Sequence, residues 1–129
     1  MLSPTFVALE TVLAIHREQL ALFGGADGIR DRGLLESAVA QPMATFGANY
    51  LHGDLYAMAA AYLFHLVQNH PFVDGNKRVG LIVTIVFLAG NGIGTKDSHP
   101  SLYDLVIEVA SGRLDKPAIA VQLQALYPK

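Results

Sequence analysis

The chain has 129 residues, of which 52% are hydrophobic, and its formal net charge is −2. Its nine lysines and arginines form no basic stripe that would indicate nucleic-acid binding, and the absence of cysteine excludes disulfides, thiolate zinc sites and a cysteine nucleophile. The longest apolar run, Gly80 to Ala89, is about half of the ~20 residues that cross a bilayer. We therefore expect one domain over residues 1–129, cytoplasmic, with no nucleic-acid or membrane partner.

Helical signals follow one another from the N-terminal end. Ser3-Pro4 is typical of a helix start, and apolar residues then recur at helical spacing as far as Gly24-Gly25. Asp31 is expected to cap a second helix over residues 32–41, which ends before Pro42. Residues 42–53 show no period and are rich in turn formers, which predicts an ordered loop or short hairpin.

The second half of the chain is expected to hold four more helices. Asp54 caps one that runs to about residue 69, with several alanines that allow close packing. A central helix follows over residues 76–90, and Asn91-Gly92 ends it. Two further helices cover residues 100–111 and 117–126, the last capped by Asp115. The fold class is thus all-α: a compact single-domain bundle of about six helices with a short flap loop or hairpin.

The segment His70-Pro71-Phe72-Val73-Asp74-Gly75-Asn76-Lys77-Arg78 is the most informative part of the sequence. It places a base, a carboxylate, a glycine, an amide and two cations directly before the central helix. A loop that leads into a helix N-terminus is suited to holding phosphate, because the first backbone amides and the helix dipole both face the anion.

Two residues of this segment suit catalysis and metal binding. His70 accepts a proton near neutral pH, so it fits a general base that deprotonates an attacking hydroxyl. Asp74 supplies a hard oxygen ligand, and Mg²⁺ is typically held by one or two carboxylates together with substrate phosphates.

The following four residues suit a phosphate cradle. Gly75 permits close backbone approach, and the amides of Gly75, Asn76 and Lys77 are predicted to point at an anion. Lys77 and Arg78 add positive charge, and arginine grips phosphate oxygens in two places. Together the segment predicts phosphoryl or nucleotidyl transfer to a hydroxyl, without choosing between them.

Each residue also has a structural interpretation: a histidine that caps a helix, an Asp-Gly turn, a solvated Lys-Arg pair. Their concentration in nine residues favours a site over these separate roles. Among the other histidines, His65 is off the helical face of His70, so a two-histidine metal site is not expected. We expect His16 and His99 at the surface or as caps, and His52 is a candidate for the border of a cleft.

Residues 70–78 resemble the signature of the Fic/Doc superfamily, and more narrowly that of the death-on-curing (Doc) toxins. Residues 23–31, residues 33–38 and Gln41-Pro42 are similar to the same group, so the resemblance covers nearly the whole chain. It implies a bundle of about six helices in which residues 42–53 form a flap that aligns the target peptide.

The resemblance also implies an activity. Fic proteins generally transfer adenylyl groups from ATP to protein hydroxyls, and their motif has glycine at the position of Lys77 and a phosphate-gripping arginine at that of Leu81. Doc toxins resemble this chain at both positions, bind ATP in reverse, and pass its γ-phosphate to a threonine of elongation factor Tu, which stops translation. By this resemblance His70 is the base, Asp74 the magnesium ligand, and Asn76, Lys77 and Arg78 hold phosphates.

Many Fic proteins are silenced by a Ser or Thr followed four residues later by Glu, and none of the four glutamates here has that partner. A Doc-like protein is instead held by a separate antitoxin whose tail folds on it. The expected function is thus a toxin that is an ATP-dependent protein Ser/Thr kinase. Alternatives are a Fic-type adenylyltransferase, which Lys77 and Leu81 disfavour, and a non-catalytic helical binding module, which the complete motif disfavours.

Overall fold

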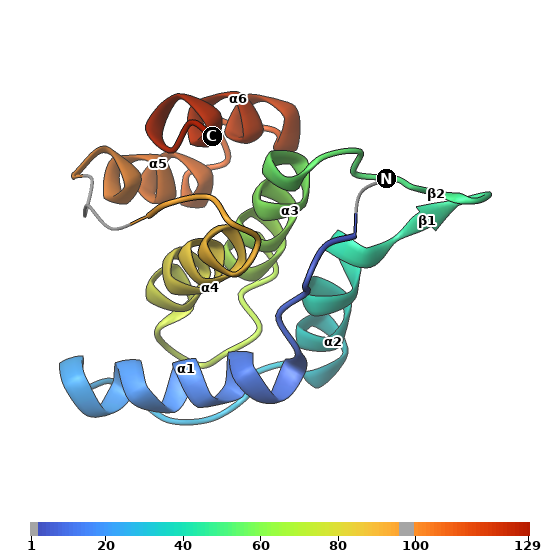
Figure 1. Ribbon diagram of the computed structural model, residues 1–129. Coiled ribbons are helices and arrows are strands. Elements are labelled where there is room, and N and C mark those ends of the chain that lie inside the picture. The colour runs from blue at the N-terminus through green and yellow to red at the C-terminus, as the bar shows by residue number, and fades with distance from the viewer. Residues whose placement is uncertain (1–2, 96–99) are drawn as a thin grey trace.

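The computed structural model describes residues 3–95 and 100–129, and these residues are mostly helical (Figure 1). Within them lie six α-helices, a short 3-10 helix and one antiparallel two-stranded hairpin, which confirms the all-α prediction. The elements are α1 (Leu9–Phe23), α2 (Arg32–Ala40), the 3-10 helix η1 (Gln41–Met43), β1 (Thr45–Phe46), β2 (Asn49–Tyr50), α3 (Leu55–Gln68), α4 (Asn76–Gly90), α5 (Pro100–Ala110) and α6 (Lys116–Leu126).

Three helices begin at aspartates, as predicted. Asp31, Asp54 and Asp115 each accept a hydrogen bond from the backbone amide three residues further on, at 2.8–3.0 Å. Each bond satisfies one of the amides that a helix leaves without an internal partner, and removing such a cap typically costs ~1 kcal/mol.

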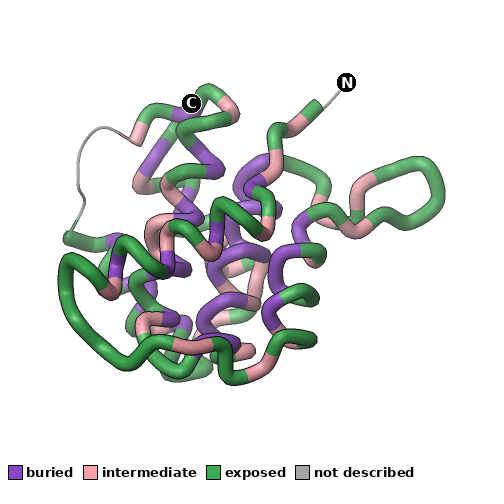
Figure 2. The backbone as a smooth tube through the Cα atoms, turned by 90° about the horizontal axis from the view of Figure 1, so that it is seen from below, coloured by how far each residue is buried: buried purple, intermediate pink, exposed green. Residues whose placement is uncertain are grey.

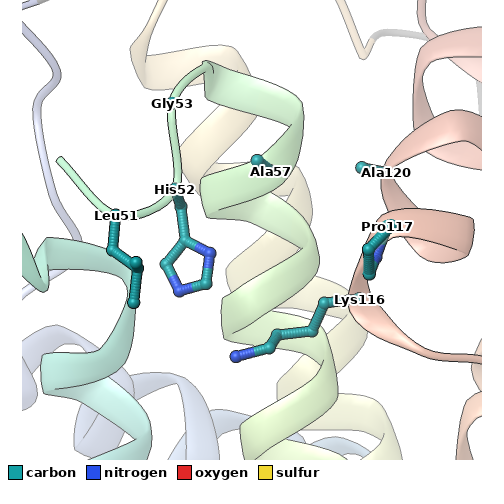
Figure 3. Close-up of a pocket in the computed structure, with 7 residues that line it drawn as sticks. All are labelled: Leu51, His52, Gly53, Ala57, Lys116, Pro117 and Ala120. Atoms are coloured by element: carbon teal, nitrogen blue, oxygen red, sulfur yellow. The ribbon is translucent and has the colours of Figure 1, made fainter.

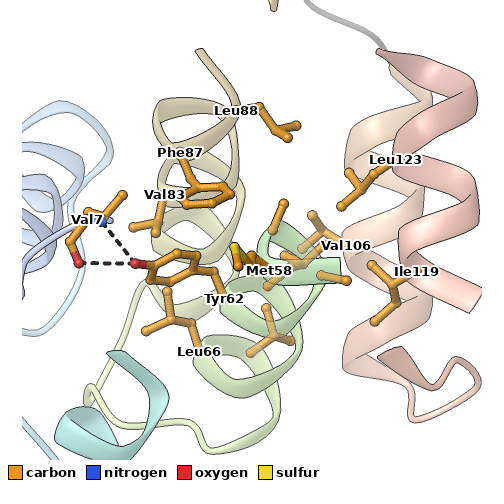
Figure 4. Packing of buried hydrophobic residues seen from close by; sticks show 14 of the residues in the cluster. Val7, Met58, Tyr62, Leu66, Val83, Phe87, Leu88, Val106, Ile119 and Leu123 are labelled. Atoms are coloured by element: carbon orange, nitrogen blue, oxygen red, sulfur yellow. Dashed lines mark hydrogen bonds between the residues drawn. The ribbon is translucent and has the colours of Figure 1, made fainter. Parts of the chain in front are cut away.

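The N-terminal segment departs from the prediction, because α1 begins at Leu9 and not at Ser3-Pro4. Residues 3–8 have no helical structure. The amide of Val7 donates to the hydroxyl of Tyr62 at 2.9 Å, and that hydroxyl donates to the carbonyl of Val7 at 3.3 Å (Figure 4). These bonds to α3 satisfy the backbone and bury Val7, so a distant partner overrides the local helix signal.

Helix α3 is the centre of the bundle. It packs against α2, α4, α5 and α6, while α1 packs against α4 (Figure 1). Buried residues line the inner sides of these helices, and the β1–β2 hairpin projects from the body of the molecule (Figure 2). Among the described residues, no helix has the length and apolarity that a bilayer crossing requires.

A glycine sets the distance between α3 and α4. A Cβ atom on Gly80 would lie 2.9 Å from a methyl group of Val67 and 3.3 Å from one of Leu63. Glycine in a helix interior costs ~1 kcal/mol relative to alanine, so its use here reflects close packing. The segment that the sequence singled out, residues 70–78, spans the short connection between these two helices and the first turn of α4.

Candidate functional site

The loop between α3 and α4 is closed by the side chain of Asn76. Its Oδ1 accepts from the amide of Phe72, and its Nδ2 donates to the carbonyl of Phe72, both at 2.9 Å. Gly75 has a φ of +85° and starts α4 without a capping side chain. The side chain of Asn76 is thus engaged within the loop, and what remains for an anion is its backbone amide in the first turn of α4.

His16 supports this loop, contrary to the expectation that it lies at the surface or caps a helix. It is 3% exposed, its ring stacks on Phe72 with centroids 3.8 Å apart, and its Nε2 donates to the backbone oxygen of Asp74 at 3.0 Å. The sequence signal for this burial was helical spacing: Val12, His16 and Gln19 share one side of the helix and form the buried face of α1. His99 lies outside the described residues.

Arg30 fixes the backbone of His70 from the segment between α1 and α2. Its Nε donates to the carbonyl of His70 at 2.6 Å, and its Nη2 donates to the carbonyl of Asn69 at 2.8 Å. The amide of Arg30 also donates to the carbonyl of Pro71 at 2.7 Å. Arg30 therefore satisfies carbonyls that the end of α3 leaves free. His70 has a φ of +51° and an exposed side chain.

Asp74 lies against the glycine-rich segment. Its two carboxylate oxygens accept from the amides of Ala26 at 3.3 Å and Gly75 at 2.8 Å. These two bonds, with a smaller contribution from Arg78, lower the pKa of the Asp74 carboxyl, so it is ionised at neutral pH. A Cβ atom on Gly25 would lie 2.8 Å from Oδ2 of Asp74, so only glycine allows this approach.

All six residues predicted from the sequence line one cleft of about 490 Å³. Helix α5 also lines this cleft, through Tyr103 and Ala110, which sequence reasoning did not connect to the site. Residues 42–53, the predicted flap, contribute none of the described lining. The lining residues are Val67, His70, Asp74, Gly75, Asn76, Lys77, Arg78, Tyr103 and Ala110.

The cleft fits a magnesium–phosphate complex better than a metal held by protein alone. Within residues 3–95 and 100–129, no group of three or more His, Cys, Asp or Glu side chains is placed to hold a metal. Asp74 is exposed and ionised, and each of its oxygens keeps a free lone pair beside its single amide bond. One carboxylate with phosphates and water is the usual environment of Mg²⁺.

His52 and His65 lie away from this cleft. His52 lines a separate cleft of about 340 Å³ between the end of the hairpin and α6, together with Lys116 (Figure 3). His65 Nε2 accepts from the ammonium of Lys116 at 3.0 Å. Burial and, secondarily, Lys116 lower the pKa of both histidines, that of His65 to about 4. Both are therefore neutral at pH 7.

Comparison with known proteins agrees with the signature in the loop. The family model described as "Fic/DOC family" matches residues 6–88, which include His16, Arg30 and the whole of residues 70–78. The chain is 31% identical over 121 residues to "Protein kinase doc" of Escherichia phage P1, covering 94% of each protein. It is 40% identical over 103 residues to "Toxin Doc" of Mycolicibacterium smegmatis, covering 78% of this chain and 79% of that protein. The chain therefore belongs to the Fic/DOC family.

Proposed function

We propose that this protein is a Doc-type toxin that transfers the γ-phosphate of ATP to a serine or threonine hydroxyl of a target protein. The observation that carries the proposal is the shared cleft, in which His70, Asp74 and the first turn of α4 face the same space. The names of the two relatives, a protein kinase and a toxin, support it.

The residues of the cleft take separate parts in this reaction. The imidazole of His70 accepts the proton of the target hydroxyl as its oxygen forms a bond to the γ-phosphorus. The bond from that phosphorus to the bridging oxygen breaks, and ADP leaves with the electron pair. Lys77, Arg78 and the free amides at the start of α4 stabilise the negative charge on the phosphoryl oxygens.

Asp74 would hold Mg²⁺ against the phosphates. The metal, when bound, neutralises phosphate charge and orients the triphosphate. The chain's own contribution is a carboxylate kept ionised by the amides of Ala26 and Gly75 and kept in place by the bond from His16 to the Asp74 carbonyl.

Two positions favour γ-phosphate transfer over adenylyl transfer. Lys77 places a cation in the first turn of α4, in the cleft that His70 also lines. Leu81, one turn further along, is apolar, so it offers no second grip for phosphates. By the same resemblance to Doc toxins, we propose elongation factor Tu in the cytoplasm as the target, arrest of translation as the consequence, and an antitoxin whose tail folds on the toxin as its restraint.

Labelled ATP distinguishes the proposal from its alternatives. The protein is incubated with Mg²⁺, a cell extract and either γ-labelled or α-labelled ATP, with His70→Ala as the matched control. We expect the γ-label alone to reach a protein, and the variant to abolish the signal. Transfer of the α-label would indicate adenylylation, and absence of both labels would favour a binding module.

A further inference from the structure

The connection between α1 and α2, residues 24–31, runs alongside the loop between α3 and α4 (Figure 1). Ile29 and Phe72 form an isolated antiparallel β-bridge, and the amide of Val73 donates to the carbonyl of Gly28 at 3.0 Å. Two segments that are distant in the sequence are therefore paired through their backbones, which gives the loop a fixed support on one side.

The side chain of Arg30 extends this support to both peptide groups that flank the Cα atom of His70. Its Nη2 donates to the carbonyl of Asn69 at 2.8 Å, and its Nε donates to the carbonyl of His70 at 2.6 Å. The first carbonyl belongs to the peptide group before this Cα atom, and the second to the peptide group after it. Because peptide groups are planar, their relative orientation is set by the φ and ψ of His70 alone. One planar guanidinium that bonds both carbonyls thus fixes the direction of the His70 side chain.

The backbone conformation that Arg30 holds is an unfavourable one for a histidine. The φ of His70 is +51°, in the left-handed region that residues with a Cβ atom rarely adopt. The next residue is Pro71, and a residue before proline favours extended backbone, with φ of roughly −120°. Relaxation to that region would turn the imidazole away from its present position in the cleft. Strain of this kind persists only where the surrounding structure imposes it.

The imidazole of His70 has no support of its own. The side chain is exposed where it lines the cleft, and among residues 3–95 and 100–129 no hydrogen bond, ion pair or ring contact involves it. A catalytic base is commonly oriented by a hydrogen bond from a third side chain. Here the position of the ring depends on the backbone that carries it.

We propose that Arg30 is a positioning residue for His70: its guanidinium holds the base in the strained conformation that directs the imidazole into the cleft. The inference rests on the proposed function, because it concerns the base of that same transfer. It also gives a role to residues 23–31, which share the family resemblance although none of them lines the cleft.

Steady-state kinetics test this role. Arg30→Ala is compared with Arg32→Ala, which removes an exposed arginine that does not line the cleft. We expect Arg30→Ala to lower the kcat of γ-label transfer roughly 10- to 100-fold, because a displacement of about 1 Å can cost 10²-fold in rate. The KM for ATP and the magnesium requirement should stay at the parent's values, because Lys77 lies on α4 and Asp74 is held by other bonds. Arg32→Ala should change none of these quantities, and an equal loss in both variants would overturn the proposal.

A double variant separates positioning from general damage to the protein. If Arg30 acts through His70, adding Arg30→Ala to His70→Ala should cause no further loss of rate, whereas losses that multiply would show that Arg30 acts elsewhere. Arg30→Lys keeps the charge but has one nitrogen in place of the fork, so it should remain slow. Full activity of Arg30→Lys would overturn the arrangement in which one guanidinium holds two carbonyls.

Carbon-13 NMR of labelled histidine reports the backbone of His70 without any reaction. Its Cα and Cβ shifts, assigned by their loss in His70→Gly, should move from left-handed to extended values in Arg30→Ala, while those of His65 stay unchanged. Unchanged shifts of His70 would overturn the inference.

The inference and the proposed function fail in different ways. A parent protein that transfers no γ-label overturns the proposed function, and the shifts of His70 still decide whether Arg30 holds its backbone. A parent that transfers the γ-label, with Arg30→Ala equally fast, overturns the positioning role alone.

Discussion

The imidazole of His16 and the backbone oxygen of Asp74 are joined by a 3.0 Å hydrogen bond, although the two residues are 58 positions apart. Because the acceptor is a carbonyl, Nε2 of His16 carries the hydrogen. The same ring stacks on Phe72, and its edge lies 3.7 Å from where a Cβ of Gly75 would be. His16 thus holds the loop between α3 and α4 at Phe72 and at the backbone of Asp74, and leaves room for little more than glycine at position 75.

We expect the hydrogen bond and the stacking of His16 to have separable effects. His16→Phe keeps an aromatic ring on Phe72 but loses the donor, whereas His16→Gln places an amide donor near Nε2 but loses the ring. His16→Phe should raise the magnesium concentration for half-maximal transfer and lower kcat by about 10-fold or more, because small displacements of catalytic groups are costly. His16→Gln should retain the parent's magnesium requirement. If the variants differ from the parent only in Tm, and not in kcat or in magnesium requirement, His16 has a packing role alone.

Gly25 should be less replaceable than its neighbour Gly24. Both have positive φ, +122° and +76°, so alanine strains either position. The Cβ at Gly24 meets no atom within 4 Å, whereas at Gly25 it meets the Asp74 carboxylate at 2.8 Å. Gly24→Ala should cost roughly 1–3 kcal/mol of stability, and Gly25→Ala more, together with a raised magnesium requirement. Denaturant unfolding measures the stability of the two variants, and a magnesium titration of the activity measures their metal requirement. Equal stability and an equal magnesium requirement in the two variants would contradict the special role of Gly25.

His70→Ala and His70→Gly should be equally inactive but not equally stable. Loss of the base should lower the rate roughly 10²–10⁴-fold in both variants. The φ of His70 is +51°, where glycine is unstrained and alanine is not. His70→Gly should therefore be about 1 kcal/mol more stable than His70→Ala, a difference of roughly 2–6 °C in Tm. Thermal unfolding measures it, and a higher Tm for the alanine variant would show that the conformation relaxes.

Asp74→Asn should affect magnesium use, whereas Asp27→Asn should not. Both aspartates are exposed, and each accepts a 2.8 Å hydrogen bond from the amide of the next residue. Only Asp74 lines the cleft. Removing its charge should lower transfer sharply and shift the activity to higher Mg²⁺, because a neutral amide is a weaker ligand for this ion. If the two variants have the same magnesium dependence, the role of Asp74 is limited to the turn.

Acid should destabilise the protein through His65. Its pKa is about 4 when folded, below the ordinary 6.5, because the ring is partly buried and faces Lys116 and His52. As pH falls, the unfolded chain binds this proton first, so the free energy of unfolding decreases between about pH 6.5 and 4 and this contribution then levels off. The lowered pKa of His52 acts in the same direction.

Lys116→Met is the matched variant for this pH effect. It removes a cation that opposes protonation of His65 while keeping an unbranched side chain. The decrease in Tm between pH 6.5 and 4 should be smaller than in the parent. The titration of Asp74 does not interfere with the change in Tm between pH 6.5 and 4, because the pKa of its carboxyl is lowered below the ordinary aspartate value. A parent Tm that is flat from pH 7 to 4 would contradict the assignment.

The sequence determined the features whose causes lie within a few residues. Aspartates cap α2, α3 and α6 because each bonds an amide three positions away. The turn-rich residues 42–53 contain the expected hairpin, and glycine ends α1. The motif at the start of α4 was evident because its functional groups are contiguous, and a short loop followed by one helical turn brings them into one place.

Only the tertiary structure decided the features that depend on distant partners. The extended start of the chain is held by Tyr62, 55 positions from Val7, against a local signal for helix. The burial of His16 and its bond to Asp74, and the place of Tyr103 beside Lys77 and Arg78, depend on how α1 and α5 pack on α4. Local patterns act over one or two turns, so they specify which helices form. Which side chains meet across those helices follows only from the packing of the whole core.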